Sequence, residues 1–278
     1  MSRMPDGAAA PSVAQVFDIL ADVYDQTGVE FFGPVGEQLV SLLEPRAGER
    51  CLDVGSGRGA ATLPLARAVG PSGSVEALDI SPAMVAQTQA LVADAGLHNV
   101  TVEVGDAADL SSRSSDFDVV ASSLVLFFLP DPAAALRTWV ERLVPGGRIG
   151  LSTFGRLDEP TQAIDALLEP YAPPRLRDPR TTGADDPFAT DERMETLLRG
   201  ADATDVRTVV VPATLEFADV ADWERFAMST GQRAMLVRVP EDERAELLGR
   251  IGAILEETRA DGGPCRVVWE MRYTLGAR

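Results

Sequence analysis

Carboxylates and glycines gather where three apolar runs end, and together they could hold a polar small molecule. The run "CLDVGSGRG" contains an acid and alternating glycines, while single acids end "SVEALD" and follow "VTVEVG". Glycine lets a backbone approach a ligand closely, and a carboxylate accepts hydrogen bonds from hydroxyl and amino groups. The residues concerned are Asp53, Gly55, Gly57, Gly59, Asp79 and Asp106.

The residue types that are missing exclude several kinds of chemistry. All 25 basic residues are arginine, and the chain has one histidine, His98, and one asparagine, Asn99. Without lysine there is no Schiff base, no P-loop lysine and no tyrosine–lysine pair of a dehydrogenase. A His-containing catalytic triad would have to use His98, and no His/Cys cluster has the spacing of a zinc site. The sequence therefore predicts no metal centre.

Alternating strands and helices must bring the acids and glycines together. Apolar runs predict strands over 50–55, 74–79, 100–105, 117–122 and 147–153. Helical patterns, with Ser12, Ser81 and Asp131 as N-caps, cover 12–25, 34–44, 60–69, 82–95 and 132–144. This alternation predicts an α/β fold with a doubly wound, mostly parallel sheet. Ligands bind such a sheet at the carboxyl ends of its strands, where the acids lie.

The regular alternation of predicted strands and helices ends at about residue 155. We expect helices near 159–171 and 189–200, a largely helical segment over 219–260, and long strands over 206–217 and 265–275. The last strand is expected to run antiparallel to the others. An insertion between the last two strands is longer than a hairpin needs, which favours a lid over the carboxyl ends.

The glycine loop has two interpretations, a dinucleotide-binding loop or a tight strand–helix turn without a ligand. Gly55-x-Gly57-x-x-Ala60 fits a dinucleotide-binding fingerprint, and Asp79 follows at the distance of a ribose ligand. A third glycine, an acid inside the first strand and the missing lysine disfavour a NAD-dependent dehydrogenase.

Four segments together resemble the class I S-adenosylmethionine-dependent methyltransferases. They are "LDVGSGRG" (52–59), "ALDIS" (77–81), "GDAADL" (105–110) and the segment 117–152, which begins "FDVVASSLV". The resemblance spans about residues 50–155, and the combined motifs are specific. It implies a Rossmann-like methyltransferase fold and S-adenosyl-L-methionine as cofactor.

The resemblance also implies which residues hold the methionine part of the cofactor. The glycines 55, 57 and 59 would pass beneath the methionine and ribose. Asp53 would orient the methionine ammonium, with the Ser122 carbonyl nearby. Arg58 is a candidate for the carboxylate, or else a solvated surface residue. Asp53 has a structural alternative as a cap of the glycine loop.

For the adenosine part, the resemblance implies that Asp79 accepts both ribose hydroxyls. Ile80 would pack on the adenine face. Asp106 would accept from the adenine amino group while the Ala107 N–H meets a ring nitrogen. Asp79 could instead cap the following helix, and Asp106 could be a turn residue.

The sequence leaves the catalytic base open. His98 precedes the third strand and so lies at the amino ends, away from the predicted cofactor site. The motif of amino methyltransferases, Asn/Asp-Pro-Pro-aromatic, is replaced by "SSLV". Tyr24 is the candidate catalytic residue, with Glu30, Tyr171, an acid of the lid, or no base as alternatives.

Substrate contacts are expected from the lid and the amino-terminal helices. The "YD" pair at Tyr24–Asp25 resembles one that closes over the cofactor in small-molecule members, although a core tyrosine is the alternative. Aromatic and methionine side chains make an apolar pocket, and equally an ordinary helix core. The substrate-binding candidates are Tyr24, Tyr171, Trp223, Met228 and Met235. Arg175, Arg177 and Arg180 are candidate anion contacts or solvated loop charges.

We therefore predict a domain plan with a covered core. Residues 1–45 form a cover, 46–155 the cofactor-binding core, 156–205 and 219–260 the lid, and 206–218 and 261–278 the closing strands. The predicted function is methyl transfer by in-line displacement to O, N or C of a small, largely apolar molecule, in secondary metabolism. The alternative is a cyclase or isomerase that keeps the cofactor as scaffold.

Charge and composition limit the partners. A net charge of −18 disfavours nucleic acid and anionic membranes as main partners. The first residues have no apolar centre of a signal peptide, and the two cysteines lie in apolar runs, as buried reduced thiols do. We expect a cytoplasmic enzyme that binds small molecules and that could form homo-oligomers.

Overall fold

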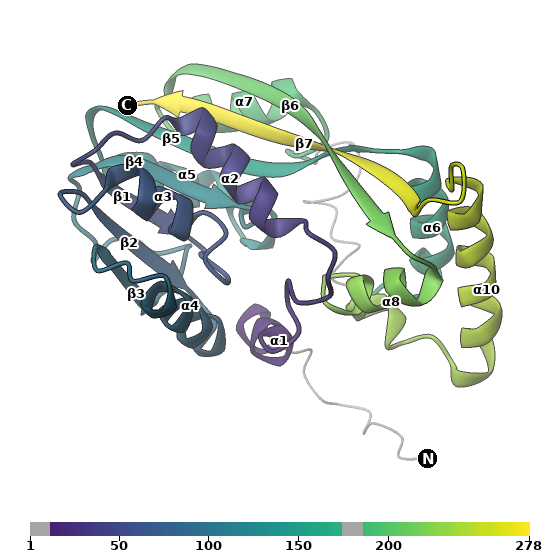
Figure 1. The fold of residues 1–278 in the computed structure, drawn as a ribbon. Helices are drawn as coiled ribbons and strands as arrows, with labels where there is room; N and C mark the ends of the chain where they lie inside the picture. Colours follow the sequence, from purple (N-terminus) through teal and green to yellow (C-terminus); the bar gives the residue numbers. More distant parts are fainter. Residues whose placement is uncertain (1–11, 174–185) are drawn as a thin grey trace.

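A mixed, mostly parallel sheet forms the centre of the protein (Figure 1). The computed structural model describes residues 12–173 and 186–278. In sheet order the strands are β3 (Val100–Val104), β2 (Ser74–Asp79), β1 (Arg50–Val54), β4 (Phe117–Ser123), β5 (Leu143–Leu157), β7 (Cys265–Ala277) and β6 (Thr204–Phe217). Strands β1 to β5 are parallel, and β7 pairs antiparallel with β5 and β6. The predicted doubly wound fold with an antiparallel C-terminal strand is confirmed.

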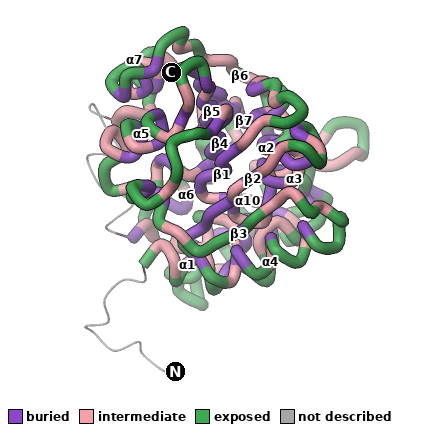
Figure 2. The backbone as a smooth tube through the Cα atoms, turned by 90° about the vertical axis from the view of Figure 1, so that its left-hand side faces the viewer, coloured by how far each residue is buried: buried purple, intermediate pink, exposed green. Residues whose placement is uncertain are grey.

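Helices cover both faces of this sheet, and Figure 2 shows the buried residues along the strands between them. One face carries α2 (Phe32–Leu43), α3 (Thr62–Val69) and α4 (Pro82–Asp94), and the other carries α5 (Pro132–Glu141) and α7 (Asp191–Arg199). Four further helices pack beside the end of β6 and the start of β7: α6 (Glu159–Leu168), α8 (Val220–Met228), α9 (Arg233–Leu236) and α10 (Glu241–Glu257). Short 3-10 turns cover Leu126–Phe128 and Glu169–Tyr171. No helix in the described part of the chain is long and apolar enough to cross a bilayer.

The predicted N-caps close the helices that frame the sheet's carboxyl edge. The Ser12 hydroxyl accepts from the Gln15 N–H at the start of α1 (Val13–Leu20). Ser81 and Asp131 cap α4 and α5 in the same way, each followed by a proline in the first turn. These caps satisfy N–H groups that a helix start leaves unpaired.

Two predicted helices end several residues earlier than expected. The helix expected over 12–25 ends at Leu20, and turns follow up to Asp25, whose φ of 54° lies in the left-handed region. The helix expected over 132–144 ends at Glu141, because Leu143 already pairs with Phe117 as the start of β5. Pairing with a neighbouring strand overrides the local helical pattern there.

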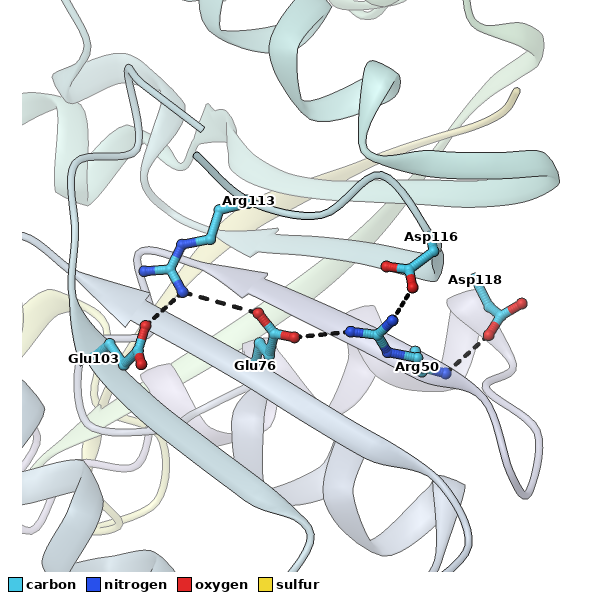
Figure 3. A network of polar contacts seen from close by, with 6 residues as sticks. All are labelled: Arg50, Glu76, Glu103, Arg113, Asp116 and Asp118. Carbon is cyan, nitrogen blue, oxygen red and sulfur yellow. Dashed lines mark hydrogen bonds and ion pairs between the residues drawn. The ribbon is translucent and has the colours of Figure 1, made fainter. Parts of the chain in front are cut away.

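An ion-pair network links β1, β2 and β3 to the loop after β3 (Figure 3). Arg50 on β1 pairs with Glu76 on β2 at 3.0 Å and with Asp116, which precedes β4. Arg113 pairs with Glu103 on β3 at 2.6 Å and reaches Glu76 at 3.8 Å. The network ties down the end of the loop that begins with Asp106.

Candidate functional site

One pocket lies at the carboxyl ends of β1 to β4 and contains most of the predicted cofactor residues. Four chain segments contribute to its wall: the amino-terminal segment and the loops that follow β1, β2 and β3, with the end of β4 closing it. The predicted residues that line it are Tyr24, Asp53, Gly55, Gly57, Asp79, Ile80, Asp106 and Ala107. The structure thus brings together residues spread over more than 80 positions of sequence.

The glycine loop has the conformation that its glycines predict. Gly55 and Gly57 have φ values of +74° and +52°, a region that other residues rarely adopt. A side chain at Gly55 would overlap that of Val125, whereas the space beside Gly57 is open. The loop is therefore tightly packed at its first glycine and free to meet a ligand at its second.

Asp79 anchors this loop and faces the pocket. Its two carboxylate oxygens accept the N–H groups of Gly57 at 2.8 Å and of Ser81 at 2.9 Å. Burial raises its pKa, and the two N–H groups oppose that rise. Each oxygen keeps acceptor capacity for a further hydroxyl donor, as the assignment to ribose requires.

Asp53 lines the pocket and carries an unsatisfied acceptor. It is 1% exposed, and its Oδ2 accepts from the Thr62 hydroxyl at 2.5 Å. Its Oδ1 is buried and has no hydrogen-bond partner within the described residues. Burial raises its pKa to about 7, against the hydrogen bond from Thr62. A cationic donor entering the pocket would satisfy this oxygen and favour the charged carboxylate.

The turn after β3 forms the opposite wall. Asp106 is exposed, and one of its oxygens accepts the Ala108 N–H at 2.8 Å, so it also forms the turn that was its structural alternative. The Ala107 carbonyl accepts from the Trp139 indole on α5 at 2.7 Å. This bond holds the turn in place from the other side of the sheet.

Two predicted cofactor residues lie behind the wall rather than in it. Gly59 packs toward Thr88, and Ser122 is buried with its hydroxyl donating to the Val54 carbonyl at 2.9 Å. The lining position at the end of β4 is taken by Ser123 and Leu124, and Leu124 has an uncommon φ of 59°. The roles predicted for Gly59 and Ser122 remain predictions.

The lid candidates do not line this pocket. The Tyr171 hydroxyl donates to Glu243 on α10 at 2.6 Å, which ties the 3-10 turn after α6 to α10. Trp223 of α8 is buried in the hydrophobic core, and Met228 and Met235 pack against that core. The reason is that α6 and α8 to α10 bury their apolar faces against β6, β7 and one another. Arg175, Arg177 and Arg180 lie outside the described residues.

The amino-terminal segment supplies wall residues besides Tyr24, and two of them, Phe17 and Phe32, were not among the predicted site residues. Phe17 of α1, Asp25 of the following turn and Phe32 of α2 line the pocket beside Tyr24. The Tyr24 and Phe32 rings lie 4.3 Å apart between centroids. Phe17 belongs to the helix predicted over 12–25, and that helical pattern was the available signal.

Arg58 joins this segment to the glycine loop. Its guanidinium donates to the Ala21 carbonyl at 3.2 Å and lies beside Asp25. It lines the pocket as well, so it is not a solvated surface residue. His98 lies in the loop before β3, beside a separate hollow formed with Gly70 and Gly73.

Comparison with known proteins identifies the family to which the chain is similar. Residues 51–147 match the family model described as a methyltransferase domain. Nocamycin O-methyltransferase from Saccharothrix syringae is 35% identical over 274 residues, which cover 94% of this chain and 96% of the relative. Aklanonic acid methyltransferase DauC from Streptomyces sp. (strain C5) is 40% identical over 150 residues, which cover 54% of this chain and 68% of the relative.

Solved structures agree on the fold. Phosphoethanolamine N-methyltransferase 2 from Haemonchus contortus, solved in complex with S-adenosyl-L-methionine, has a TM-score of 0.59 at 16% identity. The match covers 99% of this chain and 61% of that chain. With its glycine loop and strand-end acids in one pocket and a relative similar over almost its whole length, the chain belongs to the class I S-adenosylmethionine-dependent methyltransferases.

Proposed function

We propose that this chain binds S-adenosyl-L-methionine in the pocket at the carboxyl ends of β1 to β4 and transfers its methyl group to oxygen of a small, largely apolar molecule. The observation that carries the proposal is the pair Asp53 and Asp79. One has a buried oxygen without a partner, and the other has acceptor capacity directed to the same pocket. An ammonium and a ribose are groups that fit these acceptors.

The chain's own residues would bind the cofactor, orient its methyl group and shield the pocket from water. Bound S-adenosyl-L-methionine supplies an electrophilic methyl group on a sulfonium. Asp53 and Asp79 fix a ligand at two points, and the open backbone at Gly57 allows close approach. The rings of Phe17, Tyr24 and Phe32 line one side of the pocket and would exclude water from a bound ligand there. Positioning in a dry site is the main requirement of an in-line displacement.

Transfer to oxygen of a small molecule is supported by the relatives. The relative that is similar over almost its whole length is named an O-methyltransferase, and a second is named for a single acid substrate. The amino-terminal wall of the pocket is largely apolar. A small-molecule acceptor from secondary metabolism is consistent with both.

Calorimetry with S-adenosylhomocysteine tests the cofactor assignment. Asp79→Ala should weaken binding by about 1.5–3 kcal/mol, the worth of hydrogen bonds to a charged group. Asp109→Ala, an exposed acid in the loop after β3, is the matched control and should change nothing. Equal affinity of both variants and the wild type would exclude Asp79 from the cofactor site.

Mass spectrometry tests the reaction itself. Methyl transfer adds the mass of one methylene unit to the acceptor and yields S-adenosylhomocysteine, whereas cyclisation or isomerisation leaves the acceptor's mass unchanged. An acceptor converted without any gain in mass would contradict the proposed methyl transfer.

A further inference from the structure

Four aromatic side chains form one wall of the pocket. Phe17, Tyr24, Phe32 and Phe128 come from α1, the turn after it, α2 and the segment after β4. Neighbouring rings touch: the Phe17 centroid lies 5.3 Å from Phe128 and 6.0 Å from Tyr24. Phe128 is 39% exposed although it is large and apolar. Rings in such edge and tilted contacts present faces on which a flat conjugated molecule can pack.

A second layer of rings supports this wall. Phe127 packs on Phe128 at 4.6 Å and on Phe154 of β5 at 5.5 Å, and Phe31 packs on Phe32 at 5.0 Å. Phe31 and Phe154 are stacked with an angle of 7° between their planes. The wall is therefore held by neighbours from separate parts of the chain and keeps its shape.

Asp25 lies beside this wall and is the carboxylate of the amino-terminal cover that lines the pocket. The groups that act on it are Arg58 of the glycine loop, Glu30 of the same segment and the backbone N–H of Phe32 at the start of α2. Its neighbour Tyr24 keeps its proton, because burial, Asp25 and Asp79 all raise the tyrosine pKa. Tyr24 is thus unsuited to take a proton near neutral pH, whereas Asp25 is an available acceptor.

We propose that the methyl acceptor is a flat conjugated hydroxyl compound, a phenol or an enol, that packs on the wall of Phe17, Tyr24, Phe32 and Phe128 and gives its proton to Asp25. This rests on the proposed function. The acceptor's O–H bond breaks and its proton goes to the Asp25 carboxylate. The oxygen lone pair forms the bond to the methyl carbon, and the electrons of the broken carbon–sulfur bond stay on sulfur. Atoms and charge balance without a further reactant.

The strength of this base selects the class of hydroxyl. Burial and Glu30 raise the pKa of Asp25 to about 6, and Arg58 and the Phe32 N–H limit the rise. Such a carboxylate is ionised near neutral pH and accepts a proton more readily than an exposed one. The proton of a phenol, with a pKa of about 10, is within its reach when the oxygen is forming a bond. A saturated alcohol is far less acidic, and a carboxylic acid is already ionised and needs no base.

Three compounds with one carbon skeleton separate these classes: 2-naphthol, decahydro-2-naphthol and 2-naphthoic acid. Binding of each to the chain loaded with S-adenosylhomocysteine is measured by calorimetry, and methylation is measured by mass. We expect 2-naphthol to bind at least 10-fold more tightly than its saturated analogue and to be methylated. Phe128→Leu, which keeps an apolar side chain but removes the ring, should abolish that preference.

Asp25→Asn tests the base, with Asp22→Asn, an exposed acid in the same turn, as its control. Asp25→Asn should lower 2-naphthol methylation about 100-fold, the worth of a general base, while the binding of 2-naphthol and S-adenosylhomocysteine stays within threefold. The wild-type rate should fall below about pH 6, as Asp25 takes up a proton. Asp22→Asn should behave as the wild type does.

The possible failures are distinct. A chain that does not bind S-adenosylhomocysteine contradicts the proposed function. If it binds that compound but neither binds nor methylates 2-naphthol, the conjugated acceptor is wrong. If 2-naphthoic acid is methylated equally by the wild type and Asp25→Asn, while 2-naphthol is not methylated, the acceptor is a carboxylate and the role of Asp25 is wrong.

Discussion

The Ser81 hydroxyl donates a hydrogen bond of 2.5 Å to the Asp18 carboxylate and so joins α1 to the first turn of α4. The Ser81 N–H at the same time holds Asp79. The amino-terminal wall of the pocket and the acid assigned to ribose are therefore anchored through one residue, and their positions are coupled.

Loss of this link should weaken cofactor binding without unfolding the protein. Asp18→Ala is expected to weaken S-adenosylhomocysteine about 10-fold, equivalent to about 1.4 kcal/mol, because α1 loses a hydrogen bond to a charged group. Asp18→Asn keeps an acceptor and should retain most of the affinity. Glu37→Ala, at an exposed position of α2, is the control. Hydrogen exchange should show α1 less protected in Asp18→Ala alone; unchanged exchange and affinity would refute the coupling.

The first two glycines of the loop should respond differently to alanine. Gly55→Ala forces a side chain into Val125 and should cost several kcal/mol of stability, part of which Val125→Ala should restore. Gly57→Ala meets no neighbour and should cost about 1–2 kcal/mol for its left-handed backbone. Denaturant unfolding measures both. Similar losses at the two positions would contradict the packing described for Gly55.

Stability should fall as the pH rises through the titration of Asp53. Its pKa is raised from about 4 to about 7, so the folded protein holds a proton that the unfolded chain has lost. The free energy of unfolding should decrease between about pH 4 and pH 7, by up to about 1.4 kcal/mol per pH unit from this group. Asp53→Asn should remove most of this slope. Unfolding free energies in urea across that range give the test, and an identical slope in the variant would argue against it.

His98 should be dispensable for methyl transfer. It lies in the loop before β3, at the amino ends, while the pocket lies at the carboxyl ends. His98→Ala is expected to keep the wild-type turnover and its pH profile. A loss of about 100-fold, the size expected for a general base, would show that the base has been misplaced.

The sequence alone determined the fold class and most of the acids and glycines that line the pocket. A strand, a glycine loop and a helix follow one another within about 20 residues, and the φ values that the loop needs are available to glycine almost alone. Asp79 and Asp106 could be placed because parallel strands bring their carboxyl ends to one edge. Local chemistry and one topological rule were sufficient for these residues.

Only the tertiary structure decided which residues face the pocket from the cover and which fill a core. Trp223, Met228 and Met235 have the composition of a binding surface, but α8 and α9 bury or half-bury them against β6, β7 and α10. Phe17 and Asp25 line the pocket because α1 ends at Leu20 and the chain turns back over the glycine loop, where Arg58 holds it. An apolar side chain can pack in a protein core or line a ligand pocket, and the sequence pattern is the same in both cases. The packing of elements that are distant in the sequence decides which of the two occurs.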